Sequence, residues 1–139
     1  MAGKGSTYAY DQLALTLNAR ALSSVWLTSG TVGTLHVALH TADPAAGDQQ
    51  TSEVSYTGYG RVATTRTTST GGWSVSTPTS ANATANPVSA ITFGQNTSTS
   101  TGTITHFSVG LSSGGASKIL YSGTVSPNIS YQQNSTPIL

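Results

Sequence analysis

The stretches Leu35–Pro44 (LHVALHTADP) and Glu53–Val62 (EVSYTGYGRV) decide the fold class. In the first, apolar side chains occupy every second position over 34–41, which is typical of a strand with one buried face. The Asp-Pro pair ends this strand, and residues 44–53 form a polar loop. The second stretch enters another strand through a glycine-rich turn. Together the two stretches predict a strand, a loop and a second strand.

The same kind of alternation recurs along the rest of the chain. Residues that favour strands (Thr, Val, Ile and Tyr) are separated by clusters of Gly, Ser and Asn, which favour turns. Further strands are expected near 59–68, 72–77, 88–94, 102–111 and 118–125. Short strands at this spacing predict an all-β sandwich, for which we favour a jelly-roll-like form. The side chains expected to be buried in it are Leu35, Val37, Leu39, Phe93, Phe107, Val109 and Tyr121.

The two ends of the chain differ from this body. Leucine and alanine recur every three or four residues between 8 and 22, which predicts one amphipathic N-terminal helix. Residues 1–7 are interpreted as a flexible arm and 126–139 as an extended C-terminal arm, so the β-sandwich domain with its helix is expected to span 8–125. Both arms have too few apolar side chains to order on their own domain. We therefore expect them to contact neighbouring subunits.

Composition and charge exclude several classes of protein. A chain of 139 residues corresponds to one domain. Only 6% of its residues are charged and its net charge is +1, so it lacks the basic patch of a nucleic-acid-binding protein. The absence of cysteine excludes a disulfide framework. No apolar run approaches the roughly 20 residues of a membrane span, and the N-terminus lacks a signal-peptide core, so we expect synthesis in the cytoplasm and no membrane partner.

The chain offers no pattern of catalytic or metal-ligating residues. His36 and His40 lie four apart in a strand, which separates them by about 13 Å, too far to share one ion. Asp43, Asp48 and Glu53 surround one loop but match no compact calcium motif. No Gly-x-Ser-x-Gly elbow precedes a helix. We therefore predict no catalytic residue, no metal, no cofactor and no enzymatic activity.

The two opening stretches also carry a resemblance to a known family. They are similar to small virion proteins of tailed bacteriophages, which are often labelled phage tail or tail-fibre proteins. The similarity continues at Ile91–Phe93, Ile104–Gly110 and Leu120–Val125. This resemblance implies a β-rich, non-enzymatic structural protein that is made in the cytoplasm of a bacterial host and built into the virion.

Three functions remain open within these limits. A compact β-domain with loose arms is also similar to the jelly-roll cement, or decoration, proteins of some phage heads. The preferred hypothesis is accordingly a capsid cement protein that bridges major capsid subunits on the outer capsid surface. The alternatives are a tail or tail-fibre component and, because exposed aromatic rings can stack on sugars, a carbohydrate-binding module for receptor recognition.

A cement protein would contact the major capsid protein and copies of itself, as a homo-oligomer. Arginine, tyrosine and tryptophan dominate the energetics of protein interfaces. The residues predicted to contact these partners are therefore Tyr56, Tyr59, Arg61, Arg66 and Trp73.

Overall fold

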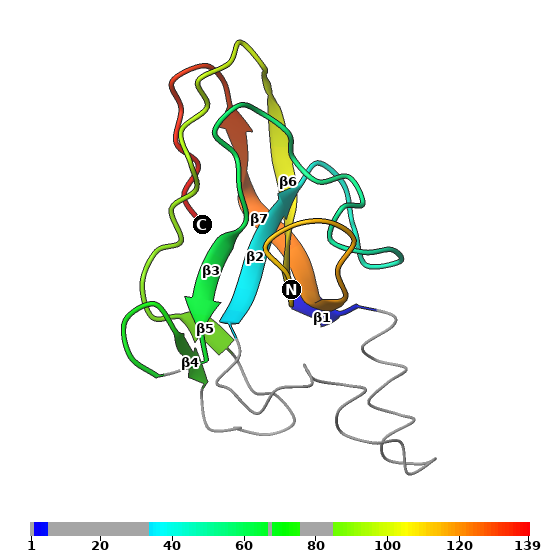
Figure 1. Cartoon of the computed structure of the whole chain (residues 1–139), viewed down its shortest axis with the longest axis vertical. Helices are drawn as coiled ribbons and strands as arrows, with labels where there is room; N and C mark the ends of the chain where they lie inside the picture. Colours follow the sequence, from blue (N-terminus) through cyan, green and yellow to red (C-terminus); the bar gives the residue numbers. More distant parts are fainter. Residues whose placement is uncertain (1, 6–33, 67, 76–84) are drawn as a thin grey trace.

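The computed structural model describes residues 2–5, 34–66, 68–75 and 85–139, and every regular element within them is a β-strand (Figure 1). The all-β class predicted from the alternation is thus confirmed. The predicted helix between 8 and 22 lies outside the described residues. The strands are β1 (Ala2–Lys4), β2 (Thr34–His40), β3 (Val62–Thr65), β4 (Trp73–Val75), β5 (Ala85–Pro87), β6 (Gly102–Gly110) and β7 (Ile119–Tyr131).

Five of these strands form one antiparallel sheet in the order β1-β7-β6-β2-β3, and β4 pairs with β5 in a second, two-stranded sheet. Because β6 and β7 are the longest strands, their pairing forms the axis of the domain (Figure 1). The jelly-roll form in particular stays a prediction. Among the described residues, no helix is long and apolar enough to cross a membrane.

The two faces of the large sheet carry different side chains. On β2 and β6, Val37 lies opposite Val109 and Leu39 opposite Phe107, so these residues share the apolar face. On the other face, Ala38 lies opposite Ser108 and His40 opposite His106. The loop after β2 covers this polar face, since the Gln49 side chain donates to the Ser108 hydroxyl.

Most of the predicted core is confirmed. Val37, Leu39, Phe93 and Val109 are buried, and Leu35 and Phe107 are partly buried against the same cluster. Tyr121 was predicted to be buried, and this is wrong, because 41% of it is exposed. Beside a bulge in β7, Tyr121 lies opposite Val109 and so shares its face, but its other neighbour is Lys4 of the edge strand β1. Tyr121 therefore lies at the margin of the apolar face, outside the buried cluster.

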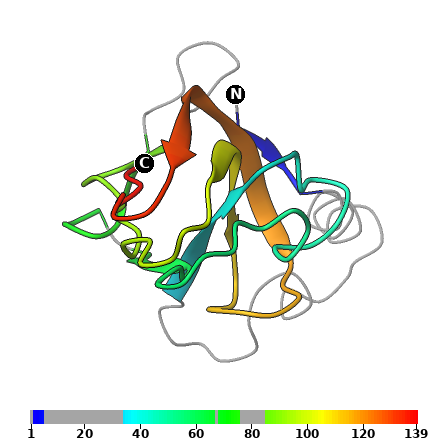
Figure 2. The ribbon, with the colours of Figure 1, turned by 90° about the horizontal axis from the view of Figure 1, so that it is seen from above.

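The two ends of the described chain both lie against the domain. β1, within the expected N-terminal arm, pairs with β7. Of the expected C-terminal arm, residues 126–131 continue β7, and residues 134–139 then run back beside 91–96 (Figure 2). The backbones of Ile91 and Leu139 exchange two hydrogen bonds of 2.9 Å, and Pro137 is buried. The strand expected near 88–94 is not formed, because β5 ends at Pro87 and the next strand begins at Gly102. The segment 91–96 instead lies between the core and the end of the chain.

Two glycines allow the turn after Tyr56 to approach this segment closely. A Cβ atom at Gly94 would overlap the carbonyl oxygen of Gly58, and one at Gly58 would overlap the carbonyl oxygen of Gln95. Gly58 also has a φ of 101°, a conformation that side chains other than glycine rarely adopt. The glycine-rich turn of the sequence thus serves backbone-to-backbone packing.

We expect Gly94→Ala to lower the free energy of unfolding by about 1–3 kcal/mol, because backbone must move to admit the methyl group. Chemical denaturation measures this loss. Gly114→Ala is the matched control, since a Cβ there would meet nothing within 4 Å. Equal stability of the two variants would contradict the close packing described here.

Candidate functional site

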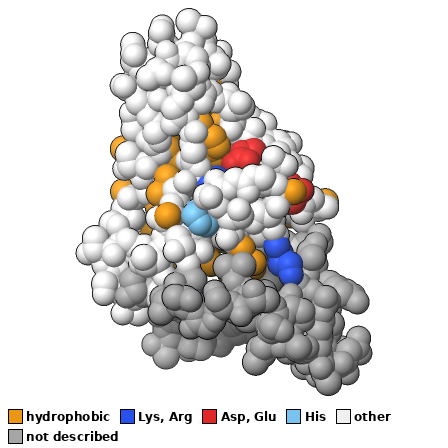
Figure 3. Space-filling model, in the orientation of Figure 1, with side chains coloured by type: hydrophobic (Ala, Val, Ile, Leu, Met, Phe, Trp, Pro, Cys, Tyr) orange, Lys and Arg blue, Asp and Glu red, His pale blue; other side chains and the backbone are white. Residues whose placement is uncertain are grey.

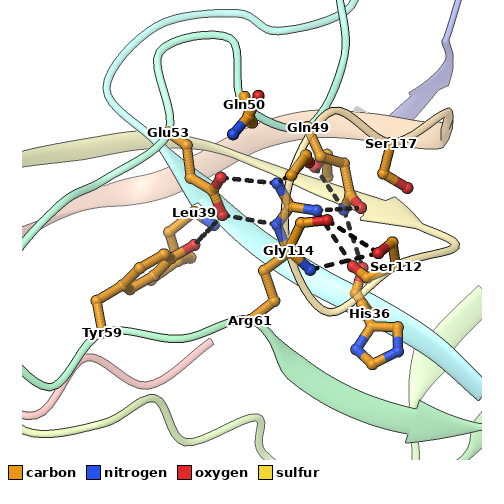
Figure 4. A network of polar contacts seen from close by, with 12 residues as sticks. His36, Leu39, Gln49, Gln50, Glu53, Tyr59, Arg61, Ser112, Gly114 and Ser117 are labelled. Atoms are coloured by element: carbon orange, nitrogen blue, oxygen red, sulfur yellow. Dashed lines mark hydrogen bonds and ion pairs between the residues drawn. The ribbon is translucent and has the colours of Figure 1, made fainter.

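The most elaborate polar arrangement among the described residues surrounds Arg61, just before β3 (Figure 4). Its side chain is only 2% exposed. Its Nε atom donates to Oε1 of Glu53 and its Nη2 atom to Oε2, both at 2.8 Å. This two-pronged geometry is the strongest form of an arginine–carboxylate pair. The hydrogen bond that Arg61 donates to Glu53 is the main cause of a raised pKa of Arg61, so the guanidinium keeps its charge.

The remaining N–H groups of Arg61 are also occupied. Nη1 donates to Oε1 of Gln49 at 3.3 Å and to the carbonyl of Ser112 at 3.1 Å, while Nη2 donates to the carbonyl of Gly115 at 2.8 Å. A guanidinium has five N–H donors, and all five have an acceptor here. Arg61 therefore joins the loop between β2 and β3 to the loop between β6 and β7.

Tyr59 connects this pair to the edge of β2. Its hydroxyl donates to Oε1 of Glu53 at 3.0 Å and accepts the backbone N–H of Leu39 at 3.0 Å. The pairing of β2 with β3 ends at Val37, and the next bridge on that edge is His40 with Glu53. The Tyr59 hydroxyl thus provides an acceptor for the N–H of Leu39, which lies between the part of β2 that pairs with β3 and the bridge of His40 with Glu53. Burial is the main cause of a raised pKa of Tyr59, so the hydroxyl keeps its proton.

Tyr59→Phe should lower the free energy of unfolding by about 1–3 kcal/mol, because it leaves the Leu39 N–H without a partner and removes one donor from Glu53. Thermal or urea unfolding measures the change. Tyr121→Phe applies the same change at an exposed tyrosine and should alter stability far less. A loss that is no larger at Tyr59 than at Tyr121 would argue against this role of the hydroxyl.

Aromatic rings pack beneath the ion pair. Tyr56 contacts Tyr59 edge to face at 5.4 Å and Tyr131 at 5.3 Å, and Tyr59 stacks on Phe93 at 6.2 Å. The Tyr56 hydroxyl donates to the carbonyl of Gly94 at 2.8 Å. The YTGYGR segment therefore supplies both the polar and the aromatic contacts that bind the segment around Phe93 to the sheet.

The carboxylates and histidines singled out in the sequence have separate local roles. Asp43 accepts the N–H of Ala45, and Asp48 accepts the N–H of Gln50, so each stabilises a turn. His40 is buried and hydrogen-bonded to Ser108 on the polar face of the sheet. In the described part of the chain, no three His, Asp or Glu side chains are placed to hold a metal ion.

The structure brings together three of the five residues predicted to contact partners. Tyr56, Tyr59 and Arg61 form one cluster that faces inward. Trp73 packs against the core and donates from Nε1 to the Thr64 hydroxyl at 3.1 Å, whereas Arg66 is exposed. The intersubunit role of the five residues stays a prediction.

The sequence did not point to Gln49 or to the carbonyls of the loop between β6 and β7. One signal could have found the ion pair. The chain has only four acidic and five basic residues, and Glu53 and Arg61 occur together within the stretch that carries the family resemblance. Two opposite charges kept so close in a chain with so few are good candidates for a buried pair.

The chain matches the model of a protein family described as podophage GP4 fiber I protein gp80 over residues 14–138. The matched range includes the Arg61 cluster and all described strands except β1. No curated protein matches the chain.

Proposed function

We propose that this chain, which belongs to the family of the podophage GP4 fiber I protein gp80, is a structural subunit of a phage tail fibre. The family match over residues 14–138 is the observation that carries the proposal. It agrees with the resemblance in the sequence to small phage virion proteins. A phage virion protein of the fibre type is thus the class to which this chain belongs.

The same match favours one of the earlier hypotheses over the others. The family takes its description from a fibre protein, whereas nothing in the match refers to the capsid. The capsid cement hypothesis, preferred from the sequence, therefore lacks support, and the tail or tail-fibre alternative fits better. We therefore propose that the protein belongs to the tail part of the virion.

The geometry of the Arg61 cluster supports a structural, non-enzymatic role. Its donors and acceptors are turned toward one another, and the side chain of Arg61 is almost wholly covered. A catalytic group must reach a substrate atom. A cluster that is closed in this way stiffens two loops and presents no group to a substrate.

The surface also suits a subunit of an assembly. In Figure 3, most of the described surface is white, which marks backbone and side chains that are neither charged nor apolar, in keeping with a chain in which 6% of residues are charged. Hydroxyl and amide groups can pack against a neighbour without the desolvation cost of buried ions. Copies of the chain itself are the partners we propose, because identical subunits commonly close into symmetric assemblies.

Fractionation of virions tests the proposal. Purified phage particles are separated into tailless heads and tail-containing fractions, and the protein is quantified by mass spectrometry against the major capsid protein as an internal standard. The proposal predicts a low copy number that follows the tail fraction. Hundreds of copies retained on tailless heads would return the assignment to capsid cement.

A further inference from the structure

A second polar chain of hydrogen bonds begins at His40, whose side chain is completely buried on the polar face of the sheet. Its Nδ1 atom lies 2.9 Å from the carbonyl oxygen of Thr51, and its Nε2 atom lies 2.7 Å from the hydroxyl of Ser108. A carbonyl oxygen can only accept, so Nδ1 must carry the proton. In the neutral ring Nε2 is then an acceptor, and Ser108 donates to it.

The donor-to-acceptor direction of these hydrogen bonds is fixed at both ends of the series. The Ser108 oxygen accepts from Nε2 of Gln49 at 3.1 Å, and Oε1 of Gln49 accepts from Arg61 at 3.3 Å. A guanidinium can only donate and a carbonyl can only accept. Hydrogen bonds therefore run in one direction from Arg61 through Gln49, Ser108 and His40 to Thr51.

A proton added at Nε2 would reverse one link of this chain. His40 would then donate to the Ser108 oxygen, and the Ser108 hydroxyl proton would lose its acceptor. The amide of Gln49 cannot turn to accept that proton, because its nitrogen would then face Arg61 and lose the bond to the carbonyl of His36. The closed arrangement thus has a place only for neutral His40.

The charges around His40 do not compensate for a positive ring. Glu53, opposite His40 on the β3 edge, already accepts from Arg61 and Tyr59. Arg61 and, on β6, His106 disfavour a second positive charge. On the far side of β6, Thr124 and Ser122 of β7 lie opposite His106 and Ser108. Neither side chain can supply a negative charge in the accessible pH range. Among the described residues no free carboxylate faces the ring.

The pKa of His40 is accordingly lowered from 6.5, with burial as the largest cause. The hydrogen bond to Thr51 and the charge of Glu53 raise the pKa, and Arg61 and His106 lower it, but burial exceeds them. A neutral His40 therefore belongs to the closed form.

We propose that His40 is an acid-sensitive latch for the segment 41–54, which is held closed while the ring is neutral and opens when the ring takes up a proton. Gln49 and Thr51, which both belong to the chain of hydrogen bonds, lie on this segment. Lifting it exposes the ring to water and removes the contacts that require neutrality. The latch rests on contacts within this domain alone, so its test is independent of the proposed function.

The sign and size of the effect follow from the difference in proton binding. The open form takes up a proton below pH 6.5, whereas the lowered pKa of His40 makes the closed form take it up only at lower pH. The closed form therefore has its full stability above pH 6.5 and loses it as the pH falls. With an ordinary histidine in the open form, the population of open molecules should rise between pH 7.5 and pH 5 by up to about 30-fold, the limit for a closed form that stays unprotonated.

Hydrogen exchange of single amides in the full-length chain tests the latch. The amides of Thr41 and Val54, which donate to Ser52 and Leu39, report on opening of the segment. After correction for intrinsic exchange rates, their opening constants should rise between pH 7.5 and pH 5, by up to about 30-fold, while those of amides in the β6–β7 ladder stay unchanged. Unchanged opening constants at Thr41 and Val54 would overturn the proposal.

Three variants separate His40 from the other histidines. His40→Gln should abolish the pH dependence of the opening, whereas His36→Gln and His106→Gln, on the same face, should preserve it. Preservation in His40→Gln would also overturn the proposal. If that variant does not fold, ring-nitrogen NMR of the wild type decides the question, because a His40 ring that protonates near pH 6.5 while Thr41 and Val54 stay protected contradicts the latch.

Discussion

Replacing Arg61 by methionine is expected to lower the free energy of unfolding by about 3–5 kcal/mol. Methionine retains much of the length of the aliphatic stem but none of the five donors. Glu53 is then left half-buried without its ion-pair partner, and the carbonyls of Ser112 and Gly115 lose theirs. An uncompensated buried charge is among the costliest single changes in a protein. Urea unfolding followed by tryptophan fluorescence measures the loss.

Three further variants show whether the loss has this cause. Arg66→Met makes the same replacement at an exposed arginine and should change stability by less than about 1 kcal/mol. Arg61→Lys should still be destabilised, since an ammonium cannot donate to both carboxylate oxygens and the loops at once. The double variant Glu53→Met/Arg61→Met should recover part of the loss, because no charge is then stranded. Equal effects of Arg61→Met and Arg66→Met would show that the contacts of Arg61 with Glu53 and the two loops do not stabilise the fold.

The second large effect is expected at Phe93. Phe93→Ala should lower the free energy of unfolding by about 3–5 kcal/mol, because it removes a buried ring and leaves a cavity. The ring is 2% exposed and stacks on Tyr59. It also anchors the segment 91–96, on which the end of the chain is paired. Loss of the ring should therefore loosen both segments.

Thr92→Ala is the matched control for Phe93→Ala, since Thr92 is the exposed neighbour in the same segment. Its stability should stay within about 0.5 kcal/mol of the wild type. Limited proteolysis provides a second readout, in which Phe93→Ala is cleaved first within 132–139. Cleavage that begins elsewhere would show that Phe93 does not hold the end of the chain.

The strands of the central sheet could be predicted from the sequence because their two faces differ. The alternation over 34–41 and 102–111 matches β2 and β6 within one residue at each end. The bulge in β7 could not be predicted in this way, because a bulge inserts a residue without changing composition. Tyr121 shares the face of Val109, as the alternation indicates, but the sequence does not show that it lies next to the edge strand β1, where 41% of it is exposed.

The structure of the C-terminal segment could not be predicted from the sequence for a different reason. Prolines usually end strands, which made 126–139 resemble an arm. In the structure Pro127 lies in β7 between Thr124, opposite His106, and Ile129, opposite Ile104, where the pairing of the two strands is irregular. A residue without an N–H is tolerated at such a place. The carbonyl of Pro137 accepts the N–H of Phe93, and no local sequence pattern predicts this long-range contact.

The candidate site was located but interpreted differently. Tyr56, Tyr59 and Arg61 were selected because aromatic and arginine side chains are enriched at interfaces. The same side chains also fill interiors, and sequence alone does not separate a partner's surface from the chain's own loops. The role of Gln49 could not be predicted, because it is one of several polar residues in its loop and only the fold brings it to Arg61.

Direct localisation on the virion tests the central claim, that this chain is a subunit of the tail fibre. Antibody fragments raised against residues 97–101, a largely exposed loop at the top of Figure 1, are applied to intact phage particles and viewed by electron microscopy. The proposed function predicts label on the fibres at the tail end and none on the head. Label distributed over the capsid surface, with bare fibres, would contradict it.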